Sequence, residues 1–116
     1  MKDFGGKIEY RNKVYNLPFD LNVMEEIQEQ YGSITKWAEL TDNNGNGEPD
    51  IKAMIFGLTA MINEGIAIEN EEKGTNIKPL TKKQVGIIVT EVGYKEAMKT
   101  LNEIVVESTK SDEKNA

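Results

Sequence analysis

The stretch KVYNLPFDLNVMEEIQEQYGS, residues 13–33, decides the fold of this chain. Its opening segment ends at Pro18, which has no N–H to continue a ladder and should therefore close a strand. Asp20 follows as a helix N-cap, because its carboxylate can accept hydrogen bonds from the first free amides. Gly32 is the corresponding stop signal. Apolar residues recur between them at helical spacing, namely Leu21, Met24, Ile27 and Tyr31. The stretch predicts a strand that leads directly into a short amphipathic helix over 21–31.

Upstream of this stretch, apolar residues flank the pair Arg11–Asn12 on both sides. Asn tolerates the positive φ that a two-residue hairpin turn requires, although Arg is less favourable than Asn or Gly at the first position. We therefore expect a β-hairpin whose strands lie near 7–10 and 13–17.

Downstream, helix start signals recur. Ser33 caps a second short helix, whose apolar residues are Ile34, Trp37, Ala38 and Leu40. Asp50 caps the most hydrophobic segment of the chain, residues 51–62. A helix that is apolar almost all round is usually buried by its neighbours, so we expect 51–62 to be the central helix. Gly57 lowers its helix propensity and makes a close helix contact plausible there.

The last two helices are also marked by local signals. Thr81 and Gln84 form a capping box before a helix that ends at Val92. Gly93 separates it from a final helix that runs from Tyr94 to Val105, with a tail after Val106. This pair could be mistaken for a DNA-binding helix-turn-helix, but its second helix offers no basic recognition surface. We interpret it as two packed core helices.

The remaining segments are polar. Residues 41–49 and 65–80 are rich in Asn, Gly, Glu and Lys and are expected to be loops, with a short extended piece at 66–69. Residues 107–116 hold almost nothing that could be buried and are expected to be a disordered C-terminal tail. The prediction is one globular domain over 1–106. Its fold class is mainly α (α+β), with about five helices around a central apolar helix and an N-terminal β-hairpin.

Composition narrows the function. The 116 residues include no cysteine and no histidine, which removes thiol nucleophiles, disulfides, imidazole bases and the usual zinc ligands. We expect no catalytic residues, no cofactor and no enzyme activity. A net charge of −6 argues against nucleic acid as a partner. No apolar run approaches the ~18 residues of a membrane span, and the first residues lack a signal peptide's apolar stretch. The expected location is the cytoplasm, with protein as the partner.

One loop resembles half of a calcium site. Asp42, Asn44, Asn46 and Asp50 fall at ligand positions of an EF-hand loop, and Gly47 falls at its sharp turn. The twelfth position should be a bidentate Glu, but it is Ala53 here. A polar loop between two helices is the simpler interpretation, so we expect no metal site. Weak calcium binding at millimolar concentration is the alternative.

Two further groups of residues could contact a partner. Methionine and aromatic side chains at helical spacing suit either a core or an adaptable docking surface. We select Trp37, Met54, Phe56 and Met61 as candidate partner-binding residues. Lys78, Lys82 and Lys83 cluster at the start of the fourth expected helix, where they could meet an acidic partner or simply face solvent.

Four short motifs, in this order and spacing, resemble the tail assembly chaperones of Gram-positive siphophages and prophages. They are the step Leu17-Pro18-Phe19-Asp20, the segment Tyr31–Trp37, the segment Met61–Gly65, and Pro79–Gly86 followed by Gly93. The order and spacing of these motifs carry the likeness. It covers about residues 7–106.

The resemblance implies a non-enzymatic virion-assembly factor. Such a protein would bind the tape measure protein, keep its apolar surface soluble, recruit tail tube subunits, and be absent from the mature virion. The alternatives are a structural head–tail connector or tail completion protein, a calcium-responsive module built on 42–50, and a host regulatory domain. The family offers no catalytic residue to transfer to this chain, and the sequence leaves the oligomeric state open.

Overall fold

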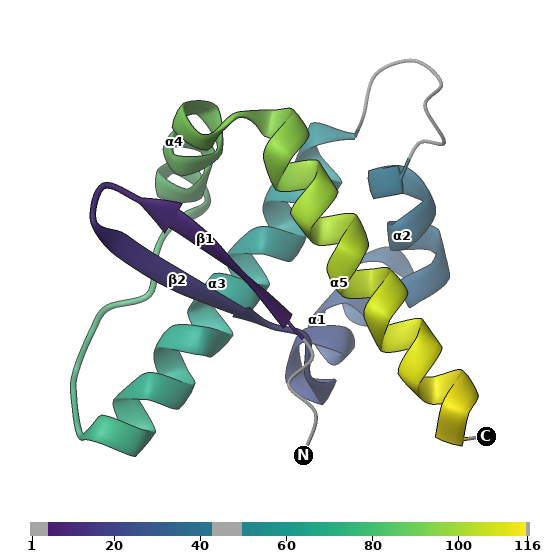
Figure 1. Ribbon diagram of the computed structural model, residues 1–116, viewed down its shortest axis with the longest axis horizontal. Helices are drawn as coiled ribbons and strands as arrows, with labels where there is room; N and C mark the ends of the chain where they lie inside the picture. Colours follow the sequence, from purple (N-terminus) through teal and green to yellow (C-terminus); the bar gives the residue numbers. More distant parts are fainter. Residues whose placement is uncertain (1–4, 43–49, 116) are drawn as a thin grey trace.

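The computed structural model describes residues 5–42 and 50–115, and within them the chain forms a two-stranded sheet and five helices (Figure 1). The elements are β1 Gly5–Tyr10, β2 Lys13–Pro18, α1 Leu21–Tyr31, α2 Ile34–Asp42, α3 Ile51–Lys73, α4 Lys82–Val92 and α5 Tyr94–Asn115. The expected fold class, mainly helical with an N-terminal hairpin, is confirmed.

The hairpin forms where the sequence predicted it. β1 and β2 pair antiparallel, with Tyr10 opposite Lys13 at the turn. Arg11 and Asn12 have φ values of 47° and 65°, the two consecutive positive values of a type I′ turn. Pro18 is the last paired residue of β2, opposite Gly5, so the strands extend slightly beyond the expected bounds.

The predicted caps form as hydrogen bonds. Asp20 accepts from the backbone N–H of Val23 at 3.1 Å and starts α1. Thr81 accepts from the N–H of Gln84 at 3.1 Å, while the Gln84 side chain accepts from the N–H of Thr81 at 2.8 Å. Each of these bonds satisfies an amide that has no partner inside its helix.

The buried face of α1 differs from the expected stripe. Val23 and Ile27 are fully buried, whereas Leu21 is 79% exposed. Met24 and Tyr31 are half-buried at the side of this face. The helix contacts α2 and α3, and this packing turns the side of Val23 toward the core. Helical spacing predicted the helix correctly, but it did not fix which residues of the helix turn toward the core.

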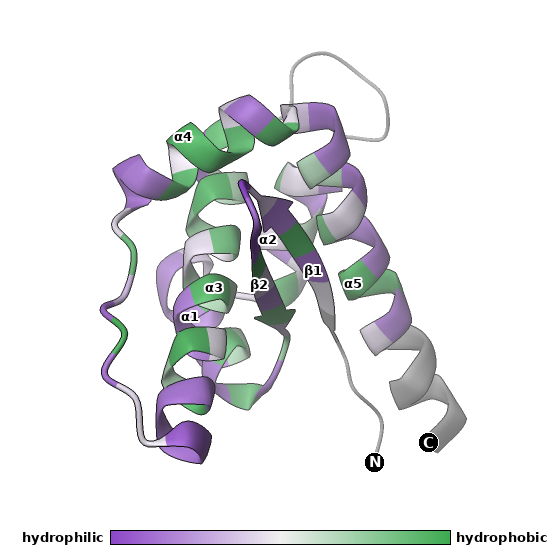
Figure 2. Ribbon diagram, turned by 60° about the vertical axis from the view of Figure 1, so that its left-hand side comes forward, coloured by the Kyte–Doolittle hydropathy of each residue, from purple (hydrophilic) through white to green (hydrophobic). Residues whose placement is uncertain are grey.

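α3 is the central helix, as expected. β2, α1, α2, α4 and α5 all contact it. Its buried residues are Ala53, Met54, Gly57, Leu58, Ala60, Met61, Ile62 and Ile66. Hydrophobic residues occupy the part of α3 beneath the other elements, and hydrophilic ones its C-terminal end (Figure 2). By length and hydropathy it is also the one helix in the described ranges that could cross a membrane. Its burial against five other elements is what the core helix of a globular domain shows.

The expected loop over 65–80 is wrong in its first half, because α3 continues to Lys73 and ends at Gly74. Gly65 does not break the helix. A Cβ at this position would stand 2.7 Å from the backbone oxygen of Asn16 in β2, so glycine here permits the hairpin to lie directly on α3. Beyond it Ile66 is buried, and the following Glu and Lys residues favour helix.

The second half of that segment is held along α3 by two asparagines. The Asn63 side chain donates to the carbonyl of Leu80 at 3.0 Å and accepts from its N–H at 2.8 Å. Asn70 makes the same pair of bonds with Ile77, at 2.9 and 3.0 Å. These side-chain amides bond backbone groups that would pair with a neighbouring strand in a sheet. The connection therefore returns along the helix in a fixed path (Figure 1).

α5 also extends further than predicted. The expected disordered tail begins at residue 107, but the helix runs to Asn115, and Ser108 is buried. No Gly or Pro follows Val106, so nothing in the sequence stops the helix. The single-domain boundary at 106 stays a prediction.

A small acidic cluster lies where α1 begins beside α3. Glu64 hydrogen-bonds with Asp20, and Asn22 donates to Glu64 at 2.9 Å. The pKa of Glu64 is raised above its ordinary value of 4.5, first by the hydrogen bond with Asp20, then by desolvation and the nearby charges of Asp20 and Glu26. The bond from Asn22 opposes this rise. The folded state therefore holds a proton at Glu64 more tightly than the unfolded chain does.

We expect Glu64→Gln to stabilise the protein at pH 7 and to have little effect near pH 4. With a raised folded-state pKa, the stability contributed by this group is present below about 4.5 and is lost as pH rises through the folded value. The expected gain in Tm at pH 7 is about 1–3 °C, because the cluster is largely solvated. Thermal unfolding at both pH values is the measurement, and Glu29→Gln controls for net charge. Equal gains for both variants would contradict the assignment.

Candidate docking surface

The structure buries three of the four partner-binding candidates. Trp37, Met54 and Met61 are fully buried, and Phe56 is half-buried with its ring edge against Tyr31. Residues in the core can contact a partner only if the domain opens. That these four residues contact a partner therefore stays a prediction, and in this conformation Phe56 is the one among them that is partly exposed.

Trp37 is instead the brace between α2 and α3. Its indole N–H donates to the carbonyl of Ala53 at 3.0 Å. Phe19, which follows β2, stacks on the indole with 6.1 Å between ring centroids. The Trp37 ring lies against Gly57, where a Cβ would overlap it. This packing accounts for a glycine inside the central helix.

An apolar groove lies elsewhere, where the start of α3, the outer face of α4 and the first residue of α5 meet. Its volume is about 830 Å³, and its lining includes Ile51, Ile55, Ile87 and Tyr94. Ile51 is 49%, Ile87 55% and Tyr94 46% exposed. Clustered apolar side chains of this exposure commonly mark an interaction site. We call this surface the α4 groove.

The α4 groove has a basic end and an acidic end. Lys83 lines it in the first turn of α4, and Glu91 lines it in the last. Glu91 accepts two hydrogen bonds from Arg11 at the hairpin tip, at 3.1 and 3.2 Å, in an exposed ion pair. Lys82 lies beside Lys83 and places its amine 5.2 Å from the centroid of the Phe56 ring. Of the three lysines predicted to cluster at this helix start, Lys83 lines the groove and Lys82 is its neighbour on α4.

Gly86 forms part of the lining of the α4 groove. Outside its own stretch of helix, a Cβ built there would meet no heavy atom within 4 Å. Its backbone is helical, and glycine in a helix costs about 1 kcal/mol relative to alanine. Neither a close contact nor a positive φ within the described structure explains this glycine, so it leaves open space in the groove at a cost in stability.

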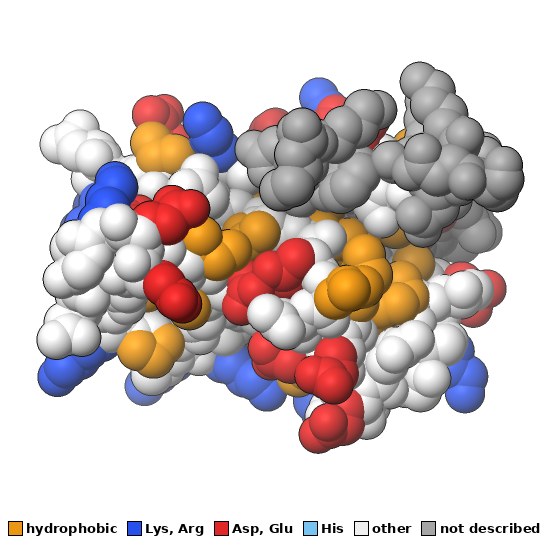
Figure 3. Space-filling view, turned by 90° about the horizontal axis from the view of Figure 1, so that it is seen from below, with side chains coloured by type: hydrophobic (Ala, Val, Ile, Leu, Met, Phe, Trp, Pro, Cys, Tyr) orange, Lys and Arg blue, Asp and Glu red, His pale blue; other side chains and the backbone are white. Residues whose placement is uncertain are grey.

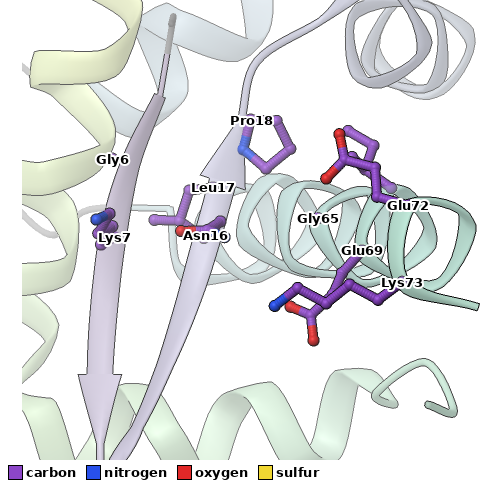
Figure 4. A pocket seen from close by; sticks show the side chains of 10 residues that line it. Gly6, Lys7, Asn16, Leu17, Pro18, Gly65, Glu69, Glu72 and Lys73 are labelled. Atoms are coloured by element: carbon purple, nitrogen blue, oxygen red, sulfur yellow. The ribbon is translucent and has the colours of Figure 1, made fainter. Parts of the chain in front are cut away.

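A second pocket of about 740 Å³ separates the start of the hairpin from the C-terminal half of α3 (Figure 4). Charged side chains surround it, namely Lys7, Glu69, Glu72 and Lys73. Ile68 is its exposed large hydrophobic residue. This mixture suits water better than an apolar partner, so we favour the α4 groove as the docking surface.

The face seen from below the view of Figure 1 carries both charged and hydrophobic side chains. Acidic side chains gather near its middle with hydrophobic ones beside them, and basic ones lie toward the edges (Figure 3). The α4 groove lies at the opposite end of the molecule, where α4 and the first turns of α3 and α5 meet (Figure 1).

The calcium-like loop falls on residues 43–49, outside the described ranges. Its flanking Asp50 accepts a hydrogen bond from the N–H of Ala53 at 2.9 Å and caps α3, as predicted. Within the described residues, acidic side chains do not gather into a group suited to a metal ion.

One residue in the sequence indicated the α4 groove, although we did not select it as a partner-binding candidate. Ile87 lies between the buried positions Val85 and Ile88 and points outward. An isoleucine on the exposed face of a short helix, next to a glycine, is unusual for a solvated surface. Tyr94, the first residue of the final helix, is half-exposed beside it.

Comparison of the chain with family models, curated proteins and solved structures gave no match. The class that the fold and surface of the described residues define is a small helical domain with an N-terminal hairpin and an exposed apolar groove beside α4.

Proposed function

We propose that this chain is a bacteriophage tail assembly chaperone, a non-enzymatic protein that binds the tape measure protein and helps recruit tail tube subunits. The resemblance of the four motifs, in their order and spacing over about residues 7–106, carries the proposal. The protein would act in the cytoplasm of the bacterial host and leave before the virion is complete.

The α4 groove supports this proposal. A chaperone for a long helical protein needs an exposed apolar surface that binds helices and later releases them, and it needs no reactive side chains. The groove offers half-exposed Ile51, Ile87 and Tyr94 outside the core, so a partner can bind without opening the domain.

Co-expression tests the function. We expect the soluble yield of the tape measure protein to rise several-fold when this chain is present, because shielded apolar helices do not associate with one another. The measurement is the soluble fraction of tape measure protein after lysis, with an unrelated acidic protein of similar size as the control. A tape measure protein that is equally soluble with either protein would overturn the proposal.

The structural-component alternative predicts a different location. A head–tail connector or tail completion protein stays in purified particles at fixed stoichiometry, whereas a chaperone is absent from them. Quantitative mass spectrometry of purified virions distinguishes the two. A fixed number of copies per particle would replace the chaperone proposal with the structural one.

A further inference from the structure

The exposed area of the α4 groove limits what can bind there. Three half-exposed side chains offer on the order of a few hundred Å² of apolar surface. A stable dimer of globular proteins buries about 800 Å² on each partner. A second copy of this chain would need much more surface than the groove supplies, whereas a single helix needs only a few apolar anchors.

The groove also has the length and charge to select such a helix. Lys83 and Glu91 are eight positions apart on α4, which corresponds to about 12 Å, or two helical turns. The Glu91 end is already paired with Arg11. The Lys83 end is basic, because Lys82 is the neighbouring residue in the first turn of α4. An acidic side chain on the incoming helix would find its complement there.

Gly86 lies between the two ends and leaves room for a side chain from the partner. Within the described residues, no heavy atom outside its own helix stands within 4 Å of a Cβ built there, and alanine there would favour the helix. In packed helices a large side chain of one helix commonly enters a hollow on the other. The open space at Gly86, between Lys83 and Glu91, is such a hollow.

We infer that the α4 groove binds one amphipathic helix of about two to three turns, which places a large apolar side chain over Gly86 and an acidic side chain beside Lys83. The partner's apolar stripe contacts Ile51, Ile87 and Tyr94. The inference rests on the proposed function only for the source of this helix, the tape measure protein. The residues that select the helix come from the groove itself.

The test uses the full chain and overlapping synthetic peptides of the tape measure protein, with affinity measured by fluorescence anisotropy. Gly86→Ala should lower the affinity for the tightest-binding peptide by about tenfold, and Gly86→Leu should lower it further. Both variants should melt at or above the wild-type temperature. Ile87→Ser should also weaken binding by about tenfold. Ile68→Ser, an exposed isoleucine outside the groove, is the matched control and should bind like the wild type.

Charge reversal tests the orientation of the bound helix. Lys83→Glu should lower the affinity for the peptide several-fold. A peptide in which the acidic residue facing Lys83 is changed to lysine should recover the affinity for this variant. Lys99→Glu, on the exposed side of α5, controls for net charge. If the lysine-substituted peptide binds the Lys99→Glu variant tightly but not the Lys83→Glu variant, the proposed orientation is wrong.

The outcomes separate the two proposals. If the wild type binds none of the peptides, the proposed function fails. If it binds them but the Gly86 and Ile87 variants bind equally well, the function holds and the α4 groove is not the docking site. If these variants instead abolish a concentration-dependent dimer in sedimentation equilibrium, the groove is a self-association surface and the inference is wrong.

Discussion

Replacing Gly57 by alanine should destabilise the protein by about 1–3 kcal/mol, although alanine is the better helix former. A Cβ at residue 57 overlaps Cζ2 of Trp37 and stands 3.0 Å from its Cε2. The indole cannot move away easily, because its N–H is bonded to Ala53 and its face stacks on Phe19. The lost stability corresponds to a fall in Tm of roughly 4–12 °C, measured by circular dichroism.

A double-mutant cycle identifies the cause. Trp37→Leu removes the indole and should itself cost about 2–4 kcal/mol, since the side chain is fully buried. In that background Gly57→Ala should become neutral or slightly stabilising, because the methyl group then meets empty space and improves helix propensity. The same loss in both backgrounds would show that Trp37 is not the reason for the glycine.

The second large effect is expected at Gly65. Alanine there would place its Cβ 2.7 Å from the backbone oxygen of Asn16 and 3.3 Å from Cδ of Pro18. A backbone carbonyl cannot rotate aside as a side chain can, so β2 must move away from α3. Leu17 and Phe19, both buried in the core, must move with it. We expect a loss of about 2–3 kcal/mol in the free energy of unfolding.

Gly86→Ala is the matched control for this prediction. It makes the same substitution in another helix, at a position with open space, and should raise stability by about 0.5–1 kcal/mol. Urea unfolding followed by the fluorescence of the single tryptophan measures both variants. A Gly65→Ala protein as stable as Gly86→Ala would contradict the close packing of the hairpin on α3.

Local signals predicted the element starts because caps act over three or four residues. Asp20, Asp50 and the Thr81–Gln84 pair each bond the amides expected from their spacing. The positive φ of Asn12 likewise follows from its own side chain. None of these features depends on distant parts of the chain, so the sequence alone could reveal them.

The errors arise where a distant contact decides. Gly65 was interpreted as the end of a helix, but its role depends on Asn16, far away in the sequence. The spacing of Ile62, Ile66 and Glu69, with Gly74 as a stop, could have indicated the longer helix. Leu21 was assigned to the core because spacing fixes a helix but not the exact direction of its buried face.

The docking surface was the least predictable feature. The partner site was predicted mainly from methionines and Trp37. Side chains of this kind also fill cores, and Trp37, Met54 and Met61 lie in the core of this protein. A residue becomes available to a partner only after the rest of the chain has been packed. The exposed position of Ile87 and the empty space at Gly86 are therefore visible only in three dimensions.

The contact between Asn16 and Gly65 also bears on the order of synthesis. The hairpin is made first. Gly65, which lies about four turns into the helix on which the hairpin rests, is added 49 residues after Asn16. At ordinary translation rates this interval lasts on the order of several seconds. A two-stranded hairpin alone is marginal in water, so Leu17 and Phe19 have no lasting cover until α3 emerges. During each round of translation, a protein that we propose as a chaperone exposes apolar residues of its own.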